Sequence, residues 1–524
     1  MSEAAPDLLT LVRRAGALAG QRPLLTVGHA TVSGAGLCAR IEGAAAGLRA
    51  AGFRPGDRLA VLLHRSVDEA IALLAAAAAG GLAVPIHQKL KDDQVAHVLA
   101  DAAPFAVVTS ATRLLALRDA GRMLASRRLF AAGPDALPPA LTATPFAALA
   151  GDPSTLVAPT SRTPAALLYT SGSTGLQKGI VQDHHNLALG AALVADYLAL
   201  QPTDHLLALL PFGFDYGLNQ LLSALHVGCR VTAADHLGAG ELAQLLRNVR
   251  PTGLAGVPSL WHEVATGLAN GTLSPADGAS LRYVTNSGGV LRTADSSVLR
   301  STWPHVRVFA MYGLTEAFRS AFLDPAEFDR FPDSFGRALP GVELLLVDPG
   351  TGAVLEGPAV GELVHAGALV AHGYWRRPEE TARRFRPDPR GGGGIAVWSG
   401  DIVRRDAAGR HWFVGRADRL LKVQGHRVSP DEVAAAVAGL PGVGEVVVFG
   451  LDGGADGHRI VLALAGDPAD PTLESRVRRQ CRARLPSYMQ PAIVRVLPTL
   501  PHNANGKVDE AALRATMGPC TDVR

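Results

Sequence analysis

The chain has 524 residues, more than one hydrophobic core usually fills, so at least two domains are expected. Its formal net charge of +3 is too small to indicate a nucleic-acid partner, and its four cysteines lack zinc-binding spacing. The alanine-rich run 70–84 is broken by two glycines and a proline, so it predicts a buried helix rather than a membrane span. The N-terminus has no basic segment followed by an apolar core, which favours a cytoplasmic protein.

The N-terminal half of the chain alternates short apolar runs with helical stretches. Residues 57–66 predict a buried strand, and residues 67–80 predict the helix that follows it. This spacing predicts an α/β fold with doubly wound, mostly parallel sheets. Further strands are expected at 84–86, 106–108, 166–169, 205–210, 230–233, 253–257 and 306–311.

The composition changes at residue 335. Residues 335–415 contain more glycine and proline and short alternating segments, which predict an antiparallel or barrel-like subdomain. The four glycines at 391–394 predict a flexible loop. A small α/β unit is expected after residue 418, with elements near 430–439 (helix), 445–449 (strand) and 472–484 (helix).

The most informative segment is the polar loop that follows the apolar run Ala165–Tyr169. It reads Thr-Ser-Gly-Ser-Thr-Gly-Leu-Gln-Lys from Thr170 to Lys178. Glycines let the backbone approach a phosphate, hydroxyl and amide groups donate hydrogen bonds, and the lysine adds a positive charge. The loop lacks the Gly-Lys-Ser/Thr of a Walker motif, so it predicts a phosphate site of another kind, or a polar turn after a buried strand.

This loop resembles the phosphate loop of the adenylate-forming superfamily, which includes acyl-CoA synthetases, adenylation domains of nonribosomal peptide synthetases and luciferases. The other motifs of the superfamily follow in the expected order over roughly residues 25–510. The resemblance implies a large N-terminal domain, residues 1–417, with two doubly wound sheets and a barrel-like subdomain over 335–415. It also implies a small mobile C-terminal α/β domain, residues 418–524. The likeness is greatest to stand-alone AMP-forming acyl-CoA or carrier-protein ligases.

The resemblance places a nucleotide in the large domain. Thr315 is expected at the α-phosphate, Glu316 at a magnesium ion and Asp401 at the ribose hydroxyls. Carboxylates suit these last two roles because Mg²⁺ prefers oxygen ligands and a vicinal diol can donate to both carboxylate oxygens. The sequences Gly373-Tyr-Trp and Pro378-Glu-Glu-Thr are expected only to pack. The residues expected to bind ATP are Thr170, Ser171, Gly172, Ser173, Thr174, Gly175, Lys178, Ser287, Gly288, Gly289, Met311, Tyr312, Gly313, Asp401 and Arg416.

The resemblance also implies a hinge and a swinging lysine. Asp418 would be the pivot of the small domain. Lys422 and Gly425 would reach the active site after rotation, where Gly425 leaves room for a pantetheine arm. An Asn-Gly turn would present Lys507 to the substrate carboxylate and the α-phosphate. The residues expected to be catalytic are Lys507, Thr315, Glu316 and Lys422.

The acid pocket is expected within residues 211–220. Peptide-synthetase adenylation domains carry a Phe-Asp here, whose carboxylate pairs with the α-ammonium of an amino acid, and Phe214-Asp215 matches that pattern. Alternatively, Asp215 caps a helix that starts at Tyr216. The Ser-Pro-Asp-Glu after the hinge is more similar to acyl-CoA synthetases, so both substrate classes stay open. The expected pocket residues are Phe212, Phe214, Asp215, Tyr216 and Asn219.

The resemblance therefore implies an AMP-forming ligase that activates a carboxylic acid with ATP and Mg²⁺. The acyl group would pass to the thiol of coenzyme A or of carrier-protein phosphopantetheine. Alternatives are an amino-acid-activating enzyme, a ligase with a non-thiol acceptor, a nitrite-activating diazotase-type enzyme, or a catalytically silent nucleotide-binding regulator. The expected partners are a small-molecule acid and an acyl or peptidyl carrier protein, with no nucleic acid and no membrane. A monomer or homodimer is expected.

Overall fold

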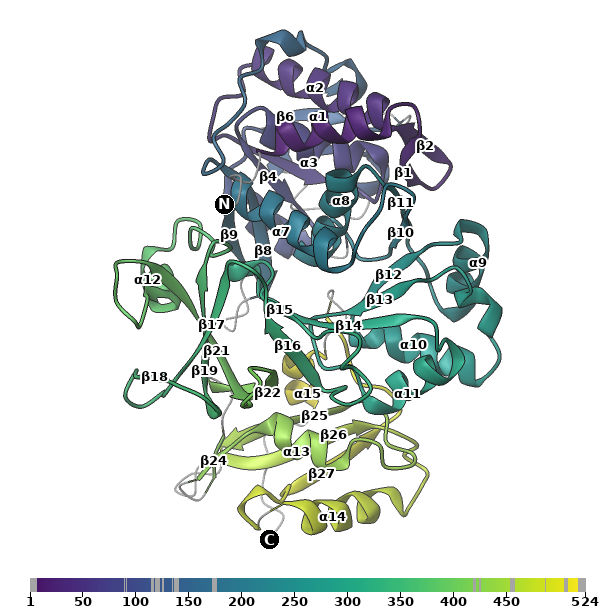
Figure 1. Ribbon diagram of the computed structural model, residues 1–524, viewed down its shortest axis with the longest axis vertical. Helices are drawn as coiled ribbons and strands as arrows, with labels where there is room; N and C mark the ends of the chain where they lie inside the picture. The colour runs from purple at the N-terminus through teal and green to yellow at the C-terminus, as the bar shows by residue number, and fades with distance from the viewer. Residues whose placement is uncertain are drawn as a thin grey trace. The chain divides into compact units, whose positions relative to one another are not determined.

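The structure is a computed structural model of the chain. It describes residues 7–516 except 89, 91, 115–116, 118–122, 125–126, 134, 136–140, 172–176, 418–420, 424–425, 453–457, 486 and 504–507. The chain forms two compact units (Figure 1). The first contains residues 1–344 and 364–398, and the second contains residues 345–363 and 399–524. Each unit has its own hydrophobic core.

The first unit contains a sheet with the strand order β7-β6-β5-β3-β4-β8-β9. Neighbouring strands are parallel, except that β8 and β9 pair antiparallel. The strand expected over 57–66 is confirmed as β3, although it is shorter than expected. The strands are β3 Arg58–Leu62, β4 Leu82–Pro85, β5 Ala106–Thr109, β6 Arg128–Ala131, β7 Ala143–Pro145, β8 Pro164–Ser171 and β9 Gln177–Asp183.

A second sheet of the first unit runs in the order β2-β1-β11-β10-β12-β13-β14 and continues through β15 and β16. The strands from β1 to β14 are parallel to their neighbours, whereas β2, β15 and β16 pair antiparallel. The mostly parallel sheets expected from the sequence are thus confirmed. The strands are β1 Pro23–Val27, β2 Ala30–Ser33, β10 His205–Ala208, β11 Arg230–Ala233, β12 Gly253–Gly256, β13 Tyr283–Asn286, β14 Arg307–Tyr312, β15 Ala321–Phe322 and β16 Ser334–Ala338.

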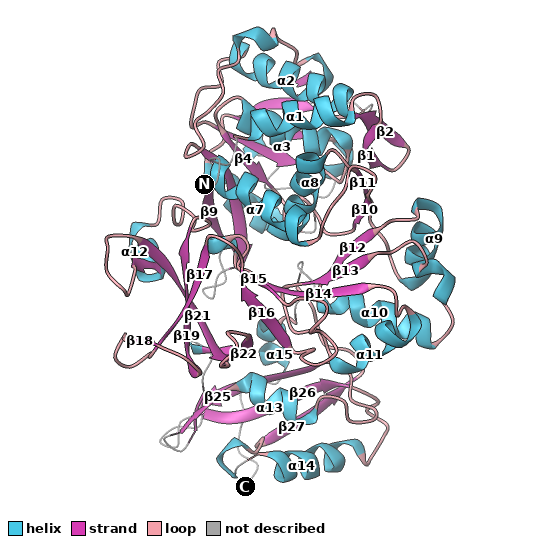
Figure 2. Ribbon diagram, viewed as in Figure 1, coloured by secondary structure: helices cyan, strands magenta, loops and turns pink. Residues whose placement is uncertain are grey.

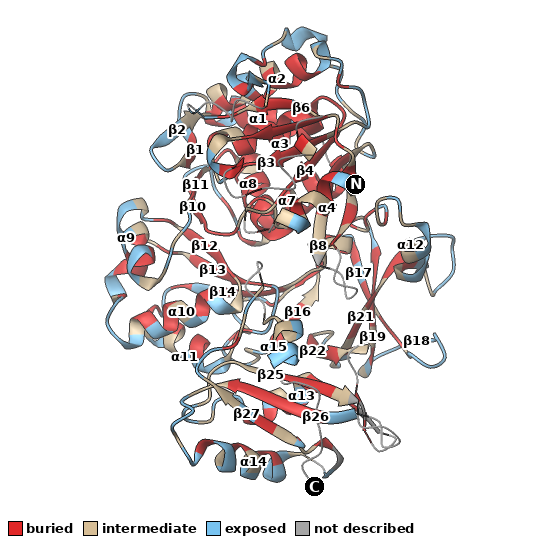
Figure 3. Ribbon diagram, turned by 180° about the vertical axis from the view of Figure 1, so that it is seen from behind, coloured by how far each residue is buried: buried red, intermediate tan, exposed pale blue. Residues whose placement is uncertain are grey.

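Helices pack against these sheets (Figure 2). Helix α1 contacts α2, α3 and α8, and α7 contacts α8. Figure 3 shows that the strands and inner helix faces are buried. The helices of this unit are α1 Leu8–Ala19, α2 Gly34–Ala50, α3 Val67–Ala78, α4 Asp92–Ala102, α5 Ala111–Leu114, α7 His184–Tyr197, α8 Asp215–Val227, α9 Ala239–Val249, α10 Pro258–Ala269, α11 Thr293–Thr302 and α12 Pro378–Arg384.

Helix α3 confirms the expected alanine-rich helix and contains a buried carboxylic acid. Ser66 begins the helix by accepting a hydrogen bond from the backbone N–H of Glu69, at 3.1 Å. Small alanine side chains allow the helix to be buried on nearly every side. Glu69 is only 9% exposed, and its Oε2 has no hydrogen-bond partner in the described part of the chain. Burial raises the pKa of Glu69 to about 7, although the charge of Arg65 lowers it.

Because the pKa of Glu69 is raised, we predict that the free energy of unfolding increases as the pH falls through about 7. The folded state takes up a proton on Glu69 as the pH falls through about 7, before the unfolded chain does. Between about pH 8 and about pH 5.5, the free energy of unfolding should therefore gain about 2 kcal/mol from this group. Denaturant unfolding of Glu69→Gln should lack that gain, whereas Asp68→Asn on the same turn should retain it. Equal pH dependence in wild type and Glu69→Gln would contradict the assignment.

The second unit contains a small sheet in which β25 pairs antiparallel and β27 pairs parallel with the central β26. Helices α13 and α14 contact each other, and α13 packs on β25 and α14 on β27. The expected helices near 430–439 and 472–484 and the expected strand at 445–449 are confirmed. The elements here are β23 Leu421–Val423, β24 His426–Val428, α13 Pro430–Val437, β25 Val446–Asp452, β26 His458–Ala465, α14 Leu473–Arg484, β27 Ile493–Leu497 and α15 Glu510–Thr516.

The region expected to be antiparallel does pair in that way: β17 pairs with β18, β20 with β21 and β21 with β22. Residues 391–394 form a loop, as expected. Within the ranges that the structure describes, no helix has the length and apolar character needed to cross a bilayer. The remaining strands are β17 Val342–Val347, β18 Val354–Leu355, β19 Ala359–Gly367, β20 Phe385–Pro387, β21 Ile395–Arg405 and β22 His411–Arg416.

Candidate active site

Several predicted site residues follow parallel strands of the second sheet. Asp215 lies beyond β10, residues 287–289 follow β13, and residues 313–316 follow β14. Parallel neighbours place their carboxyl ends on one edge of a sheet, where α/β proteins bind ligands. Two contacts join these segments: Thr315 Oγ1 donates to Asp215 Oδ2 at 3.2 Å, and the Tyr216 hydroxyl is hydrogen-bonded to Thr285 Oγ1.

Asp215 is a buried carboxylate, with 6% of the residue exposed. Its Oδ1 accepts a hydrogen bond from the backbone N–H of Tyr216 at 2.7 Å, and Oδ2 accepts the bond from Thr315. Burial raises the pKa of Asp215, while the charge of Arg319 and the two hydrogen bonds lower it. No described lysine or arginine forms an ion pair with Asp215. The site therefore contains a desolvated acid that a ligand cation could neutralise.

The alternative in which Asp215 caps a helix starting at Tyr216 is wrong. Helix α8 starts at Asp215 itself, and Phe214 occupies the N-cap position without a side-chain hydrogen bond to the helix. An N-cap side chain accepts from the second or third N–H of the helix, whereas Asp215 reaches only the N–H of Tyr216. Gly217 brings this turn against the preceding loop, because a Cβ there would lie 2.2 Å from the carbonyl oxygen of Pro211.

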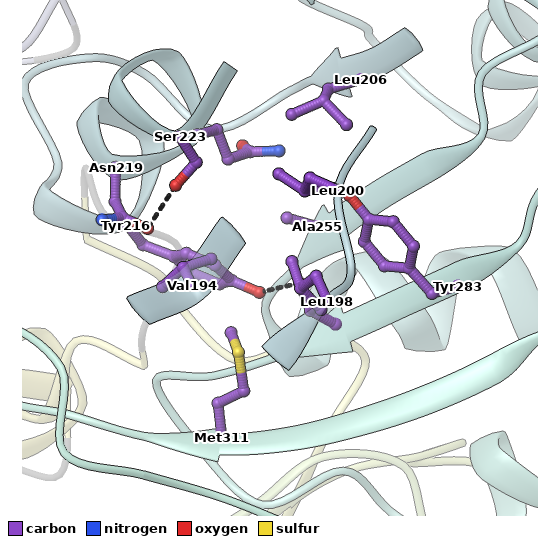
Figure 4. A pocket seen from close by; sticks show the side chains of 12 residues that line it. Val194, Leu198, Leu200, Leu206, Tyr216, Asn219, Ser223, Ala255, Tyr283 and Met311 are labelled. Carbon is purple, nitrogen blue, oxygen red and sulfur yellow. Dashed lines mark hydrogen bonds between the residues drawn. The ribbon is translucent and has the colours of Figure 1, made fainter. Parts of the chain in front are cut away.

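A small cavity adjoins the buried end of this site (Figure 4). Tyr216 and Asn219 from α8 line it together with Thr285 from β13. Met311, expected near the nucleotide, also lines the cavity and accepts a hydrogen bond at Sδ from the Tyr197 hydroxyl at 2.7 Å. The lining combines apolar side chains with a few hydrogen-bonding groups.

Two other predicted pocket residues support α8 from its N-terminal side. Phe212 is completely buried, with the guanidinium carbon of Arg65 lying 5.8 Å from its ring centre. Phe214 meets the Tyr216 ring edge-on, with 6.3 Å between ring centres. These contacts fix the start of α8, and with it Asp215, by packing.

The predicted nucleotide segments on β13 and β14 are also fixed locally. Asn286 donates from Nδ2 to the carbonyl oxygen of Gly289 at 2.8 Å, which shapes the turn containing Ser287 and Gly288. Gly288 has φ +82°, a conformation that favours glycine. Tyr312 stacks on Phe335 with 4.5 Å between ring centres.

Lys178 belongs to a chain of polar contacts that the sequence did not predict. It lies on β9 opposite Thr170 of β8, forms an ion pair with Glu380, and lies 5.7 Å from the ring centre of Tyr374. The Tyr374 hydroxyl donates to Glu316 Oε1 at 2.6 Å. Tyr374 and Glu380, expected only to pack, thus hold two predicted nucleotide-site side chains in position.

These contacts bear on the magnesium assignment of Glu316. A carboxylate oxygen is a suitable ligand for Mg²⁺, which in nucleotide sites keeps water and phosphate oxygens as its other ligands. Among the residues that the structure describes, no group of three or more histidine, cysteine or acidic side chains could hold a metal ion. The donor set fits an ion that arrives with a nucleotide better than a resident metal.

Replacing Glu316 by glutamine should lower the affinity of the active site for magnesium without disturbing the residues around it. Glutamine keeps an oxygen that can accept from Tyr374 but removes the charge. We expect the apparent magnesium affinity to fall by about 10- to 100-fold, measured by ATP–pyrophosphate exchange at varied Mg²⁺. Tyr374→Phe, which keeps the ring and the carboxylate, should lose less. An unchanged magnesium requirement in Glu316→Gln would contradict the role.

The predicted ribose residues lie in the second unit and contact each other. Asp401 on β21 and Arg416 on β22 face one another in antiparallel register and form an ion pair at 3.1 Å. The backbone N–H of Asp401 donates to Ser399 Oγ at 3.0 Å, and Asp401 is 3% exposed. The pair provides an ordered carboxylate whose charge Arg416 stabilises.

Several predictions lie outside the residues that the structure describes. The side chains of Ser171 and Lys422 are not described either, although their backbones lie on β8 and β23. The undescribed predicted residues are Gly172, Ser173, Thr174, Gly175, Asp418, Gly425 and Lys507.

Two family patterns match the sequence. The pattern of AMP-binding enzymes matches residues 12–375, and that of the AMP-binding enzyme C-terminal domain matches residues 432–507. The chain belongs to the AMP-binding enzyme family. The resemblance to adenylate-forming enzymes is therefore confirmed.

Two similar proteins indicate which class of reaction the enzyme catalyses. The chain is 33% identical to the L-proline--[L-prolyl-carrier protein] ligase of Streptomyces coelicolor, over 97% of this chain and 96% of that protein. It is 29% identical to a dimodular nonribosomal peptide synthase of Bacillus subtilis, over 88% of this chain but only 19% of that synthase. The protein is an ATP-dependent, AMP-forming ligase.

Solved structures share the α/β fold, with its large N-terminal body and small C-terminal domain. ATP-bound MatB from Rhodopseudomonas palustris superimposes with a TM-score of 0.85 at 27% identity, covering 97% of this chain and 98% of that one. The O-succinylbenzoate coenzyme A synthetase MenE of Bacillus subtilis, solved with ATP and magnesium, gives 0.81 at 23% identity, covering 97% and 99%.

Proposed function

We propose that this enzyme activates an amino acid as its aminoacyl-adenylate and transfers it to the phosphopantetheine thiol of a separate carrier protein. The observation that carries the proposal is Asp215, a buried carboxylate that neither caps α8 nor forms an ion pair with a described residue. A buried charge is costly unless it is paired, and the α-ammonium of an amino acid would pair it. The 33% identity to a prolyl-carrier protein ligase supports the same substrate class and acceptor.

The adenylation step needs positioning rather than a base. The substrate carboxylate is already ionised at neutral pH, so one of its oxygens attacks the α-phosphorus of ATP as the bond to pyrophosphate breaks. Asp215 would fix the amino group, and Thr315, hydrogen-bonded to it, would contact the α-phosphate. Lys178 would exchange Glu380 for phosphate oxygens. A magnesium ion held by Glu316 would supply charge neutralisation at those oxygens.

In the second half-reaction, different residues of the C-terminal domain would face the same active site. We infer that residues 1–417, with a barrel-like subdomain over 335–415 and two doubly wound sheets, bind ATP and the acid, with Asp401 and Arg416 at the ribose. Residues 418–524 would rotate about Asp418, withdrawing Lys507 and bringing Lys422 and Gly425 to the adenylate. The carrier thiolate would then attack the acyl carbon, forming a thioester and releasing AMP.

The acceptor can be tested directly. The enzyme is incubated with ATP, magnesium and a mixture of amino acids in the presence of pantetheine, coenzyme A or a holo-peptidyl carrier protein, and thioesters are identified by mass spectrometry. We expect aminoacyl thioester to form fastest on the carrier protein. Formation on coenzyme A at an equal or greater rate would contradict the proposed acceptor.

A further inference from the structure

Arg319 is buried in the first unit without the partners that a buried guanidinium normally has. The residue is 3% exposed. Its Nε and Nη2 have no hydrogen-bond acceptor among the residues that the structure describes. Burying a charged group without hydrogen bonds is unfavourable, so such a group in a folded protein calls for an explanation.

The guanidinium lies at the acid pocket. Its carbon is 4.7 Å from the ring centre of Tyr216, in cation–π contact. A Cβ atom on Gly313 would lie 3.4 Å from Nη1, so the guanidinium also packs against the segment that carries Thr315. Asp215 is close enough for the Arg319 charge to lower its pKa, but the two side chains form no ion pair.

The backbone holds Arg319 in this place. Phe318 has φ +48°, which is disfavoured for a residue with a side chain. Its fully buried ring packs so closely on α7 that a Cβ on Gly190 would lie 2.3 Å from it. On the other side, Ser320 Oγ is hydrogen-bonded to His365 Nδ1 at 2.8 Å. Arg319 is therefore directed inward by two fixed neighbours, rather than held by contacts of its own nitrogens.

Helix α8 carries a second buried donor without a partner. Asn219 is 2% exposed, lies one turn after Tyr216 on α8 and lines, with Tyr216, the small cavity of Figure 4. Its Nδ2 has no hydrogen-bond partner in the described part of the structure. The unsatisfied atoms on Arg319 and Asn219 are all donors, and a ligand group that accepts hydrogen bonds, above all an anion at Arg319, would satisfy such donors.

We propose that the substrate is an amino acid with an acidic side chain, and that Arg319 binds the side-chain anion. This inference rests on the proposed amino-acid activation. With such a substrate, Asp215 pairs with the α-ammonium, Arg319 pairs with the side-chain carboxylate, and the α-carboxylate is left to react. A neutral side chain would leave the guanidinium buried and unpaired, which disfavours binding.

The test compares matched substrates in ATP–pyrophosphate exchange. L-aspartate and L-glutamate are paired with L-asparagine and L-glutamine, which have the same shape without the charge, and with L-proline as a neutral reference. We expect an acidic member to exceed its amide partner by about 100-fold in kcat/KM, because the amide has no charge and only one acceptor oxygen, and its NH2 group cannot accept from the buried guanidinium. Preference for an amide, for proline or for another neutral side chain would overturn the inference.

Variants of Arg319 distinguish binding of the substrate side chain from a purely structural role of the arginine. Arg319→Gln should lower kcat/KM for the preferred acidic amino acid by about 10- to 100-fold and should not lower it for the amide partner, which no longer leaves a guanidinium unpaired, while Arg319→Lys restores part of the loss. Arg307→Gln, an exposed arginine on β14, is the matched control and should behave as wild type. An equal loss for acidic and amide substrates, or a rise in the KM of ATP alone, would show that Arg319 serves Asp215 or the phosphates instead.

Succinate and glutarate distinguish this inference from the function on which it rests. They keep the side-chain carboxylate of aspartate and glutamate but lack the amino group. Exchange with these diacids equal to that with the amino acids would refute ammonium pairing and leave anion binding by Arg319 standing. Conversely, exchange that requires the amino group but occurs only with amino acids of neutral side chain would support ammonium pairing and refute the role of Arg319.

Discussion

Lys507→Ala should lower the rate of adenylation by about 100- to 1,000-fold, the usual effect of removing a group that stabilises charge in a transition state. The lysine is expected to bridge the substrate carboxylate and the α-phosphate, where negative charges meet as the new bond forms. The effect is measured as kcat for amino-acid-dependent ATP–pyrophosphate exchange. Exchange at the wild-type rate in this variant would refute its role.

Lys422→Ala is the matched control for Lys507→Ala. Both replace one of the five lysines of the chain by alanine in the C-terminal region. Lys422 is assigned to the thiol-transfer conformation, so its loss should slow thioester formation and leave pyrophosphate exchange intact. If both variants lose exchange equally, rotation about Asp418 does not separate the two half-reactions.

Asp215→Asn should selectively weaken the use of amino acids. Truncating one member of a buried charged pair costs about 2–5 kcal/mol, which corresponds to about 30-fold or more in kcat/KM. Asparagine keeps an oxygen for the Tyr216 N–H and a polar group beside Thr315, so the fold of this turn should persist. The measurement is exchange with an amino acid and with its des-amino analogue. Equal losses for both would remove the ammonium-pairing role, and Asp196→Asn on the exposed face of α7 should change neither.

The raised pKa of Asp215 also predicts that the KM for the amino acid depends on pH. Because burial raises its pKa, Asp215 takes up a proton at a higher pH than an ordinary aspartate as the solution is acidified. The protonated form cannot pair with an ammonium, so the KM for the amino acid should rise as the pH falls through this range. The KM for the des-amino analogue should not show this rise, and Asp215→Asn should abolish it.

Much of the fold could be predicted from the sequence, because the spacing of apolar residues and the local composition indicate secondary structure. The apolar runs gave β5, β10, β11 and β14 close to their observed positions, and the alanine run gave α3. The first residue of a helix was harder to predict. Asp215 has the chemistry of an N-cap residue, and only the backbone geometry shows that α8 begins one residue earlier than the capping alternative requires.

The contacts between distant segments could not be derived from local patterns. Tyr374 and Glu380 lie about 200 residues from Lys178, and nothing in their own sequence context distinguishes them from packing residues. Arg319 was overlooked, although it lies only three residues after Glu316 in a segment already assigned to the site. An arginine that close to a nucleotide motif was the available signal, but its burial without acceptors emerges only from the packed structure.

The central claim, that the buried carboxylate at the start of α8 selects an amino acid for adenylation, is tested most directly by one screen. ATP–pyrophosphate exchange is measured with amino acids, fatty acids, aryl acids and nitrite, each offered alone to the enzyme with magnesium. The account predicts exchange with α-amino acids and none above background with acids that lack an amino group. Exchange driven by uncharged acids or by nitrite, or no exchange with any acid, would contradict it.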